Sequence, residues 1–315
     1  MIGRIIEIAS DGRYLSVERG FLQINHKGQL VGQIPLDDIS ALIANAHGLS
    51  YSNNVLLALS ERGAPIVLCG SNHRPTAIVW PIENHHRQAA RVDAQLRAKI
   101  PLKKRLWQTI VQSKIAMQAA VLQLHGLPNM PLLRMIDKVK SGDTSNTEGQ
   151  AARAYWQLLM GKKFKRDTDA DDVNGLFNYG YTVLRATVAR HLIAAGLHPG
   201  IPLFHKNEGN AMRLVDDVME PFRPIVDIFV RKLANDGHAQ VDAMTKPILG
   251  LVPTRSLRMS YGISPVSLVI QRLCVSLAQA YEDPKLKLSL PTGSSFELSA
   301  LFDEHQEEQA EIPEA

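Results

Sequence analysis

The periodicity of the sequence changes near residue 88, and this limits the chain to folds that combine a strand-rich part with a helical part. Before this point, short β-branched or alternating runs are separated by turn pairs such as Asp11-Gly12 and Lys27-Gly28, which is typical of short strands. One helix is predicted over residues 53–62, ending at Gly63. Residues 1–80 are therefore predicted to form a small β-rich domain.

After residue 88, apolar residues recur at spacings of three and four, which is the period of a helix. The longest such stripe stops before Gly126 and consists of Leu102, Leu106, Ile110, Val111, Ile115, Val121 and Leu122, with the polar Lys114 and Gln118 at the same spacing. Further helices are predicted at residues 148–160, 175–195, 213–233 and 264–281. The fold class that follows is α+β, with a linker at 81–87 between the β-rich domain and a larger all-α-helical domain at 88–290.

The composition is typical of a soluble globular protein, with 45% hydrophobic and 21% charged residues. The longest apolar runs, APIVLCG and TAIVWP, are much shorter than a bilayer span, and the N-terminus carries charges where a signal peptide has its apolar core. We therefore expect a cytoplasmic protein with no membrane partner. Cys69 and Cys274 are far apart and lack a metal-binding spacing, so both are expected to be reduced thiols.

The formal net charge of +4 hides an uneven distribution along the chain. Residues 91–290 contain 28 Lys and Arg against 17 Asp and Glu, whereas residues 291–315 contain none against 7. The basic middle of the chain could neutralise nucleic-acid phosphates, although many helical surfaces are basic without binding any. The acidic end, residues 291–315, has few large apolar residues and is expected to be a disordered tail.

The segment 204–227 places acidic residues among apolar residues that are expected to be buried. On a helix, Asp217 and Glu220 share one face with Arg213, and Pro221 predicts a kink or helix junction beside them. His205 follows an extended stretch and should lie at a loop end or helix start. A metal site and ordinary salt bridges, to Arg213 and Arg223, explain the two acids equally well at this point.

A third candidate site lies at residues 145–152. Glu148 falls in the first turn of a predicted helix, where the helix dipole favours an acidic side chain without any further role. Small residues follow it, beginning with Gly149, and they would leave room for a metal-bound phosphate at the helix N-terminus. Other reaction types find no support, because the sequence has no GxxxxGKS/T phosphate loop, no HExxH zinc motif and no GxSxG nucleophile elbow.

Four motifs resemble one known family, the CRISPR-associated adaptation integrases that are the universal spacer-acquisition proteins. They are NTEGQAARAYW at 146–156, NYGYTVL at 178–184, GLHPGIPLFH at 196–205 and LVDDVMEPFRPIVD at 214–227. They occur in the order that the family shows, and the similarity runs over essentially the whole chain. The later segment MSYGISPVSLVIQRLCVSLAQAY, at 259–281, is most similar to members of type II systems, which use a single large effector nuclease.

The resemblance implies a set of site residues. In the family, the residues that match Glu148, His205 and Glu220 are catalytic and bind one Mn²⁺ or Mg²⁺, and many relatives have Asp in place of Glu220. The residue that matches Asp217 supports them. Weaker candidates for supporting or phosphate-positioning roles are Asn178, Tyr179, Arg223 and Lys206, although Asn178 and Tyr179 would serve equally well as hydrogen-bonding residues of the core.

The resemblance also implies the reaction and the partners. The 3′-hydroxyl of a foreign DNA fragment attacks a phosphodiester at the border of the CRISPR repeat, and no covalent protein intermediate is needed. A homodimer built through the β-rich domains, together with a small companion adaptation protein, would join both fragment ends. Two alternatives remain: a metal-dependent nuclease that cuts branched or single-stranded DNA without joining it, and a basic DNA-binding scaffold without activity.

Basic side chains of the helical domain are candidates for contacts with the DNA backbone, and for each of them a solvated helix face is the alternative. These candidates are Lys103, Lys104, Arg105, Lys162, Lys163, Lys165 and Arg166.

Overall fold

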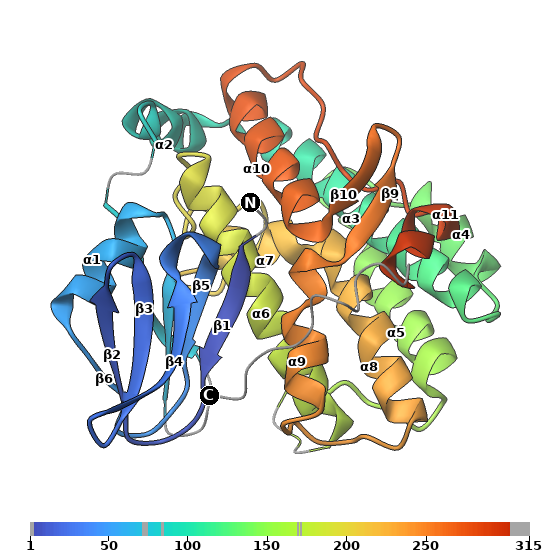
Figure 1. Ribbon diagram of the computed structural model, residues 1–315. Coiled ribbons are helices and arrows are strands. Elements are labelled where there is room, and N and C mark those ends of the chain that lie inside the picture. Colours follow the sequence, from blue (N-terminus) through green and yellow to red (C-terminus); the bar gives the residue numbers. More distant parts are fainter. Residues whose placement is uncertain (1–2, 71–74, 83–84, 169, 171, 303–315) are drawn as a thin grey trace. The chain divides into compact units, whose positions relative to one another are not determined.

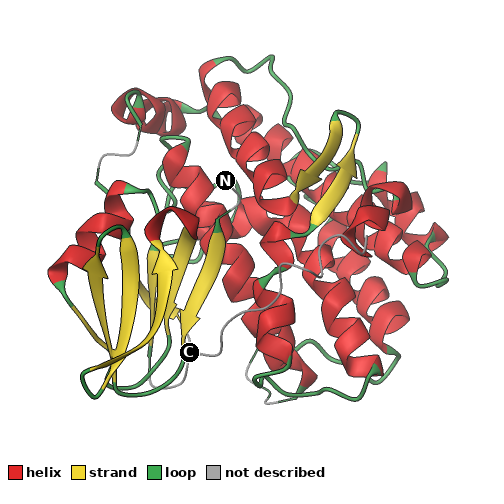
Figure 2. Cartoon of the chain, viewed as in Figure 1, coloured by secondary structure: helices red, strands yellow, loops and turns green. Residues whose placement is uncertain are grey.

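A computed structural model describes residues 3–70, 75–82, 85–168, 170 and 172–302 of the 315-residue chain. The chain divides between His86 and Arg87 into two compact units. The first unit is rich in strands and the second is mostly helical (Figures 1 and 2), which confirms the predicted fold class. The division lies at the end of the segment 81–87 that the sequence suggested as a linker.

Two four-stranded sheets form most of the first unit, with strand orders β1-β5-β7-β8 and β4-β3-β2-β6. In the first sheet β1, β5 and β7 are parallel, and β8 runs antiparallel to β7. The elements of this unit are β1 (Arg4–Ile8), β2 (Arg13–Glu18), β3 (Phe21–His26), β4 (Gln29–Pro35), the 3-10 turn η1 (Leu36–Asp38), β5 (Ile39–Ala44), β6 (Ser50–Tyr51), α1 (Asn53–Glu61), β7 (Ile66–Cys69) and β8 (Pro75–Val79).

Local turn chemistry sets the register of the β3–β4 hairpin. Lys27 and Gly28 both have positive φ, 51° and 80°, as a two-residue type I′ hairpin turn requires. The pairing places Leu22 and Ile24 on the buried face, where they meet Leu15 of β2 and Val55 of α1. Residues of both sheets and of α1 share this apolar core, so neither sheet depends on its own strands alone.

The second unit contains ten helices among the residues that the structure describes, together with three 3-10 turns and one hairpin. They are α2 (Gln88–Arg97), α3 (Ile100–Leu124), α4 (Met130–Ile136), α5 (Thr147–Met160), α6 (Val173–Ala194), α7 (Arg213–Met219), η2 (Glu220–Phe222), α8 (Arg223–Asn235), α9 (Thr245–Gly250), η3 (Val252–Thr254), β9 (Ser256–Met259), β10 (Gly262–Pro265), α10 (Val266–Glu282), α11 (Ser295–Leu298) and η4 (Ser299–Phe302).

Helix α3 is the central element of this unit. Every residue from Ile115 to Leu122 is buried, so this part of the helix is covered on all sides. The apolar stripe of the sequence marks only one face of it, and the alanines between the stripe residues complete the burial. A helix that is apolar all round belongs in the interior of a domain.

Two expectations about this unit need correction. The antiparallel hairpin β9–β10 interrupts the helices, so the domain is mostly rather than entirely helical. Residues 295–302, assigned from the sequence to a disordered tail, form α11 and η4, because Leu298 and Leu301 are completely buried and Ser294 caps α11. The remainder of that tail, residues 303–315, lies outside the described residues.

The predicted single helix at 213–233 is two helices joined by the 3-10 turn η2. Pro221 lacks the amide that would continue the hydrogen-bond ladder of α7, so the backbone tightens at Glu220. The junction expected from Pro221 is therefore confirmed. None of the helices in the described part of the chain is both long enough and apolar enough to span a bilayer.

Candidate metal centre

Two side-chain caps fix the start of α5, where Glu148 lies. Asp143 accepts hydrogen bonds from the backbone N–H of Thr147 (2.8 Å) and Glu148 (3.0 Å), and Asn146 accepts one from Gly149 (3.3 Å). These amides would otherwise be unpaired at the helix N-terminus. A Cβ on Gly149 would lie 2.7 Å from Oδ1 of Asn146, so the cap fills the space that was expected to admit a phosphate.

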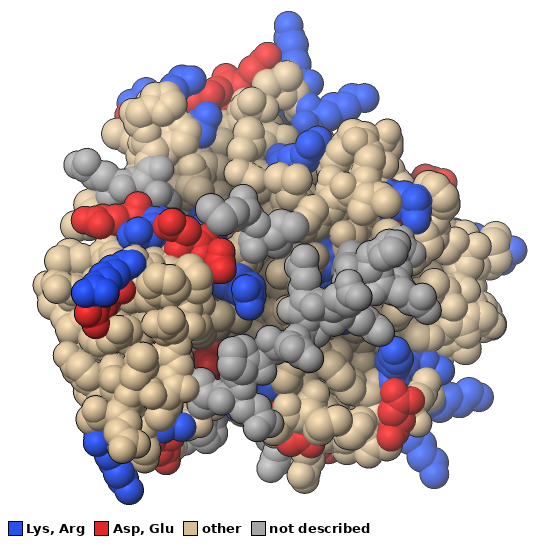
Figure 3. Space-filling view, viewed as in Figure 1, with Lys and Arg blue, Asp and Glu red and all other residues tan. Residues whose placement is uncertain are grey.

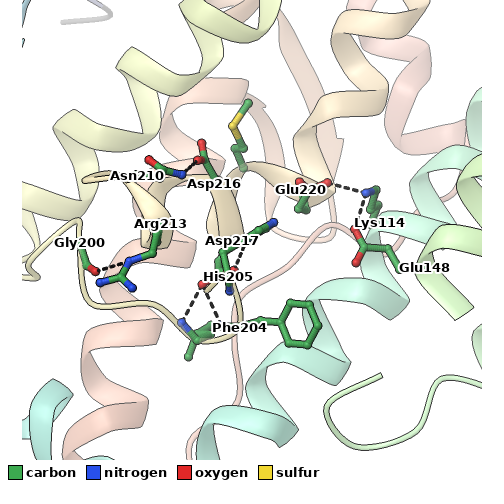
Figure 4. Close-up of polar contacts among 12 residues, drawn as sticks. Lys114, Glu148, Gly200, Phe204, His205, Asn210, Arg213, Asp216, Asp217 and Glu220 are labelled. Atoms are coloured by element: carbon green, nitrogen blue, oxygen red, sulfur yellow. Dashed lines mark hydrogen bonds and ion pairs between the residues drawn. The ribbon is translucent and has the colours of Figure 1, made fainter. Parts of the chain in front are cut away.

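His205 lies in the loop before α7, as predicted, and Asp217 of α7 fixes its position (Figure 4). Nδ1 of His205 lies 2.6 Å from Oδ1 of Asp217, and the same carboxylate accepts the backbone N–H groups of Leu203, Phe204 and His205. Asp217 is fully buried, and its four bonds satisfy its charge. A carboxylate only accepts hydrogen bonds, so Nδ1 carries the proton and Nε2 is the nitrogen that could bind a ligand.

The aromatic side chain of Trp107, from α3, supports this loop. It is fully buried, stacks on Phe204 with ring centroids 4.6 Å apart, and meets the imidazole of His205 edge-on at 5.8 Å. The His205 side chain nevertheless keeps 37% of its surface exposed, so a ligand can reach it from solvent.

Glu220 occupies the first position of η2 and is almost completely buried. Its Oε1 lies 3.0 Å from Nε of Arg223, while its Oε2 lies 2.5 Å from Nζ of Lys114 on α3. Lys114 also donates a 2.6 Å hydrogen bond to Glu148, so one ammonium group joins the two acids (Figure 4). The buried carboxylate of Glu220 is thus held between two cationic groups, Lys114 and Arg223.

These charges perturb one another's ionisation. Burial disfavours the ionised form of Glu220, but Arg223 and Lys114 outweigh this effect and lower its pKa. Burial also opposes the charge of Lys114, yet Glu220 and Glu148 raise the pKa of its ammonium group. The hydrogen bond to Asp217 raises the pKa of His205 above its usual 6.5, against the opposing effect of partial burial. These shifts favour the ionised form of Glu220 and the charged form of Lys114.

Another buried acid, Asp227 of α8, links three helices through its hydrogen bonds. It accepts hydrogen bonds from Tyr155 of α5 (2.9 Å) and Tyr181 of α6 (2.5 Å), and burial raises its pKa to about 7. The guanidinium of Arg223 lies over the ring of Tyr181, 4.9 Å from its centroid. Arg223 thus contacts both Glu220 and the aromatic ring of Tyr181, whose hydroxyl is held by Asp227.

The donor set agrees in part with a site for Mn²⁺ or Mg²⁺. In the part of the chain that the structure describes, no three His, Cys, Asp or Glu side chains are gathered closely enough to coordinate an ion together. Nevertheless, Glu148 and Glu220 both contact one cation, and His205 is held in a fixed orientation nearby. Carboxylates with one imidazole suit Mn²⁺, and also Mg²⁺ when water completes the shell.

The other acidic and basic residues of segment 204–227 lie outside this arrangement. Asp216 pairs with Arg185 (2.8 Å) and accepts a bond from Asn210, so its side chain is engaged apart from Asp217. Arg213 donates to the carbonyl of Gly200 (3.2 Å) rather than to Asp217 (Figure 4). The salt bridge proposed between Arg213 and the acids is therefore absent from the described contacts, whereas the one between Arg223 and Glu220 is present.

The weaker supporting candidates take different positions. Asn178 is half-buried; it donates to the carbonyl of Thr168 (3.0 Å) and accepts from Arg166. The ammonium nitrogen of Lys246 lies over the ring of Tyr179, 5.9 Å from its centroid. Lys206 is exposed directly beside His205 and remains suitably placed for a phosphate.

The predicted DNA contacts fall into two groups. Arg166 is half-buried, with its guanidinium 5.5 Å from the ring centroids of both Phe177 and Tyr181 and hydrogen-bonded to Asn174. The remaining candidates are partly or fully exposed: Lys103, Lys104, Arg105, Lys162, Lys163 and Lys165. Figure 3 shows that Lys and Arg side chains on the drawn face project at separate places rather than in one continuous patch.

Sequence analysis missed Lys114 as a residue of the site. Its signal was present, because a lysine stands within the apolar stripe of the longest helix and a buried lysine requires an anionic partner. Asp143 was also missed, since its capping role depends on a positive φ of 46° that a sequence does not show.

Comparison with known proteins places this geometry in a family. The model of the family described as "CRISPR associated protein Cas1" matches residues 6–248. A relative from Neisseria meningitidis serogroup C (strain 8013), named CRISPR-associated endonuclease Cas1, is 39% identical over 237 residues, which cover 75% of this chain and 77% of the relative.

Two solved structures have the same fold at low sequence identity. One, titled "Casposase bound to integration product", has a TM-score of 0.79 at 18% identity and covers 98% of both chains. The other belongs to a Cas6-RT-Cas1–Cas2 complex and has a TM-score of 0.71 at 18% identity, covering 94% of this chain and 36% of the larger one. The family match, the 39% identical relative and the shared fold together show that this chain belongs to the Cas1 family of CRISPR-associated proteins.

Proposed function

We propose that this chain is a divalent-metal-dependent DNA integrase of CRISPR adaptation, which joins the 3′-hydroxyl ends of foreign DNA fragments to the CRISPR repeat. The observation that carries the proposal is the convergence of Glu148 and Glu220 on one cation, beside an imidazole that Asp217 orients. Membership of the Cas1 family supports it, as does the name endonuclease carried by the 39% identical relative.

Three side chains would hold the ion. Glu148 and Glu220 would each offer a carboxylate oxygen, and His205 would offer Nε2, because Asp217 engages Nδ1. Mn²⁺ or Mg²⁺ would polarise the target phosphate and lower the pKa of the attacking hydroxyl. Asp217 keeps the imidazole in one tautomer and one orientation, and supporting hydrogen bonds of this kind strengthen metal sites.

The reaction exchanges one phosphodiester for another. The 3′-oxygen of the fragment forms a bond to the phosphorus at the repeat border, and the bond from that phosphorus to the 3′-oxygen of the repeat strand breaks. The attacking hydroxyl loses a proton and the departing 3′-oxygen gains one, so neither ATP nor a covalent protein intermediate is required. Arg223 remains engaged with Glu220 throughout, while the exposed Lys206 could contact the phosphate backbone.

The proposed partners follow from the need to join both ends of a DNA fragment. One site joins one end, so we propose a homodimer that uses the β-rich units, acting in the cytoplasm with a small companion adaptation protein. A solved complex of the same fold contains Cas1 and Cas2, which supports a companion of this kind. The substrates are the DNA fragment and the CRISPR repeat, and the exposed lysines of the helical unit would contact their backbones.

An alternative is a nuclease that cuts branched or single-stranded DNA, because the same site could activate water in place of a sugar hydroxyl. The endonuclease name of the relatives favours keeping this alternative. A basic DNA-binding scaffold without activity is the third possibility, and it would not require Glu148 or His205.

One assay separates the three. The purified protein and its small partner are incubated with a labelled 3′-hydroxyl duplex, a supercoiled repeat-containing plasmid and Mn²⁺. Variants Glu148→Ala and His205→Ala test the site, and Asp93→Asn is the control because that acid lies at the surface and pairs with the exposed Arg97. We expect transfer of label into the plasmid, abolished in both site variants and retained in Asp93→Asn. Cutting without transfer would establish the nuclease, and transfer that persists in both site variants would exclude this metal site.

A further inference from the structure

Lys114 has a position that the proposed reaction does not by itself explain. It is the charged residue in the middle of α3, its side chain is 11% exposed, and its neighbours Ser113 and Ile115 are buried. A lysine in such surroundings loses the hydration of its ammonium group and needs anionic partners in return. It has two, Glu148 at 2.6 Å and Glu220 at 2.5 Å, which come from helices far apart in the sequence.

The same two carboxylates are the ones proposed to hold the metal. Figure 4 shows the ammonium group of Lys114 between them. The charges of Lys114 and Arg223 already balance those of Glu148 and Glu220. A divalent cation added to this arrangement would leave two excess positive charges in a buried place, where they interact strongly. The ammonium group and the metal therefore compete for the same oxygens.

We propose that Lys114 is the resident cation of the metal-free site, which holds Glu148 and Glu220 together until a divalent ion displaces it. This inference rests on the proposed function, since it takes Glu148 and Glu220 as metal ligands. In this role the lysine prevents the half-buried Glu148 and the buried Glu220 from repelling each other when no metal is bound. It also weakens metal binding, because the ion must replace an existing ion pair.

Removal of this charge should change metal affinity and metal-free stability in opposite directions. In Lys114→Met, which keeps most of the side-chain volume, we expect Mn²⁺ to bind about tenfold more tightly, as loss of one competing ion pair predicts. In EDTA the same variant should unfold several degrees below the wild type, because Glu148 loses its ion-pair partner and the buried Glu220 keeps only Arg223 among its described ion pairs. Saturating Mn²⁺ should restore most of this difference.

The experiment measures Mn²⁺ dissociation constants by electron paramagnetic resonance and unfolding temperatures with EDTA or Mn²⁺, all without DNA. Lys114→Gln is a second uncharged variant in case Lys114→Met folds poorly, and Lys99→Met is the control because that lysine is exposed directly before the same helix. Glu148→Gln tests the ligand role separately.

The outcomes separate the inference from the proposed function. Unchanged or weaker Mn²⁺ binding in both uncharged variants, with binding lost in Glu148→Gln, would overturn the role of Lys114 and leave the metal site intact. If the wild-type protein itself bound no Mn²⁺, or Glu148→Gln bound it normally, the metal site would be wrong and the inference would fail with it.

Discussion

The carboxylate of Asp217 holds both the ring and the backbone of His205. Its Oδ1 lies 2.6 Å from Nδ1 of the imidazole and 3.2 Å from the backbone nitrogen of the same residue. One buried acid on α7 therefore sets the path of the preceding loop and the tautomer of the only imidazole in the site. The two residues are 12 positions apart in the sequence, but the loop folds back onto α7 and brings them into contact.

Asp217→Asn should weaken the site without removing a ligand. An amide can still accept from the backbone, but its NH₂ group cannot accept the proton of Nδ1. We expect Mn²⁺ affinity and DNA joining to fall by about 10- to 100-fold, the usual effect of losing such a support. Asp217→Ala should fall further and also lose stability, since three buried amides lose their acceptor. Equal, wild-type metal affinity in both variants would contradict this role.

The pH dependence of metal binding should reflect His205. A protonated imidazole cannot bind a cation, and the hydrogen bond to Asp217 raises the pKa of His205 above 6.5. Mn²⁺ affinity should thus begin to fall above pH 6.5 as the solution is acidified. Asp217→Asn removes the cause of the shift, so its fall should occur at lower pH. Titrations at intervals between about pH 5.5 and 8.5 give both profiles.

Asp227 should make folding stability depend on pH. Its pKa is about 7 in the folded protein and 3.8 in the unfolded chain, so between these values the folded state binds a proton that the unfolded state lacks. Stability should therefore fall as the pH rises from about 4 to about 7, by up to a few kcal/mol.

Asp227→Asn cannot ionise and should lose this slope, becoming more stable relative to the wild type at pH 8 than at pH 5. Urea unfolding at the two pH values measures the difference, and Asp236→Asn, an exposed acid at the end of the same helix, is the control. A slope that survives in Asp227→Asn would assign it to another group.

Gly180→Ala should destabilise the protein although alanine is the better helix former. A Cβ at this position of α6 would overlap Cγ1 of Val226 on α8, where the two helices pack closely. Overpacking of this kind typically costs about 1–3 kcal/mol, more than the gain in helix propensity. Val226→Ala in the same chain should restore part of the loss, and additive effects of the two changes would show that they do not interact.

Substitutions at the predicted DNA-contact residues should affect two different properties, duplex binding for some residues and folding stability for others. Replacement of the exposed Lys162, Lys163 and Lys165 by Ala should weaken duplex binding and reduce its salt dependence, as loss of phosphate contacts does. Arg166→Ala should instead lower the unfolding temperature, because it removes contacts with Phe177 and Tyr181. Binding isotherms at several salt concentrations, together with thermal unfolding, decide between the two effects for each residue.

Much of the fold could be predicted because local patterns and tertiary packing agree. The strands of residues 1–80 are short β-branched or alternating runs separated by turn residues, and α5 and α6 follow their apolar spacing to within a few residues. The short helices α2, α4 and α9 were missed. Each has at most ten residues, and α2 has few apolar residues, so burial against neighbouring helices rather than periodicity stabilises them.

The site was predicted less completely than the fold. Glu148, His205 and Glu220 were singled out through motifs, and Asp217 and the junction at Pro221 through helical spacing. Lys114 and Trp107 could not be assigned to the site because their role depends on how α3 meets α5 and η2 in space. A residue in the apolar stripe of a helix is expected to belong to the hydrophobic core. Only its tertiary contacts show that Lys114 is instead the counter-ion of two acids.

The 3-10 turn at Glu220 also restricts how this segment can vary in evolution. Asp217 and Glu220 are aimed by their separation along one helical path, and each added or deleted residue would rotate the later side chain by about 100°. Substitution of the intervening, buried Val218 changes only packing, whereas a change of length would turn Glu220 away from Lys114. The segment should therefore tolerate residue substitutions but not insertions or deletions. Its length should vary less among relatives than its amino-acid sequence.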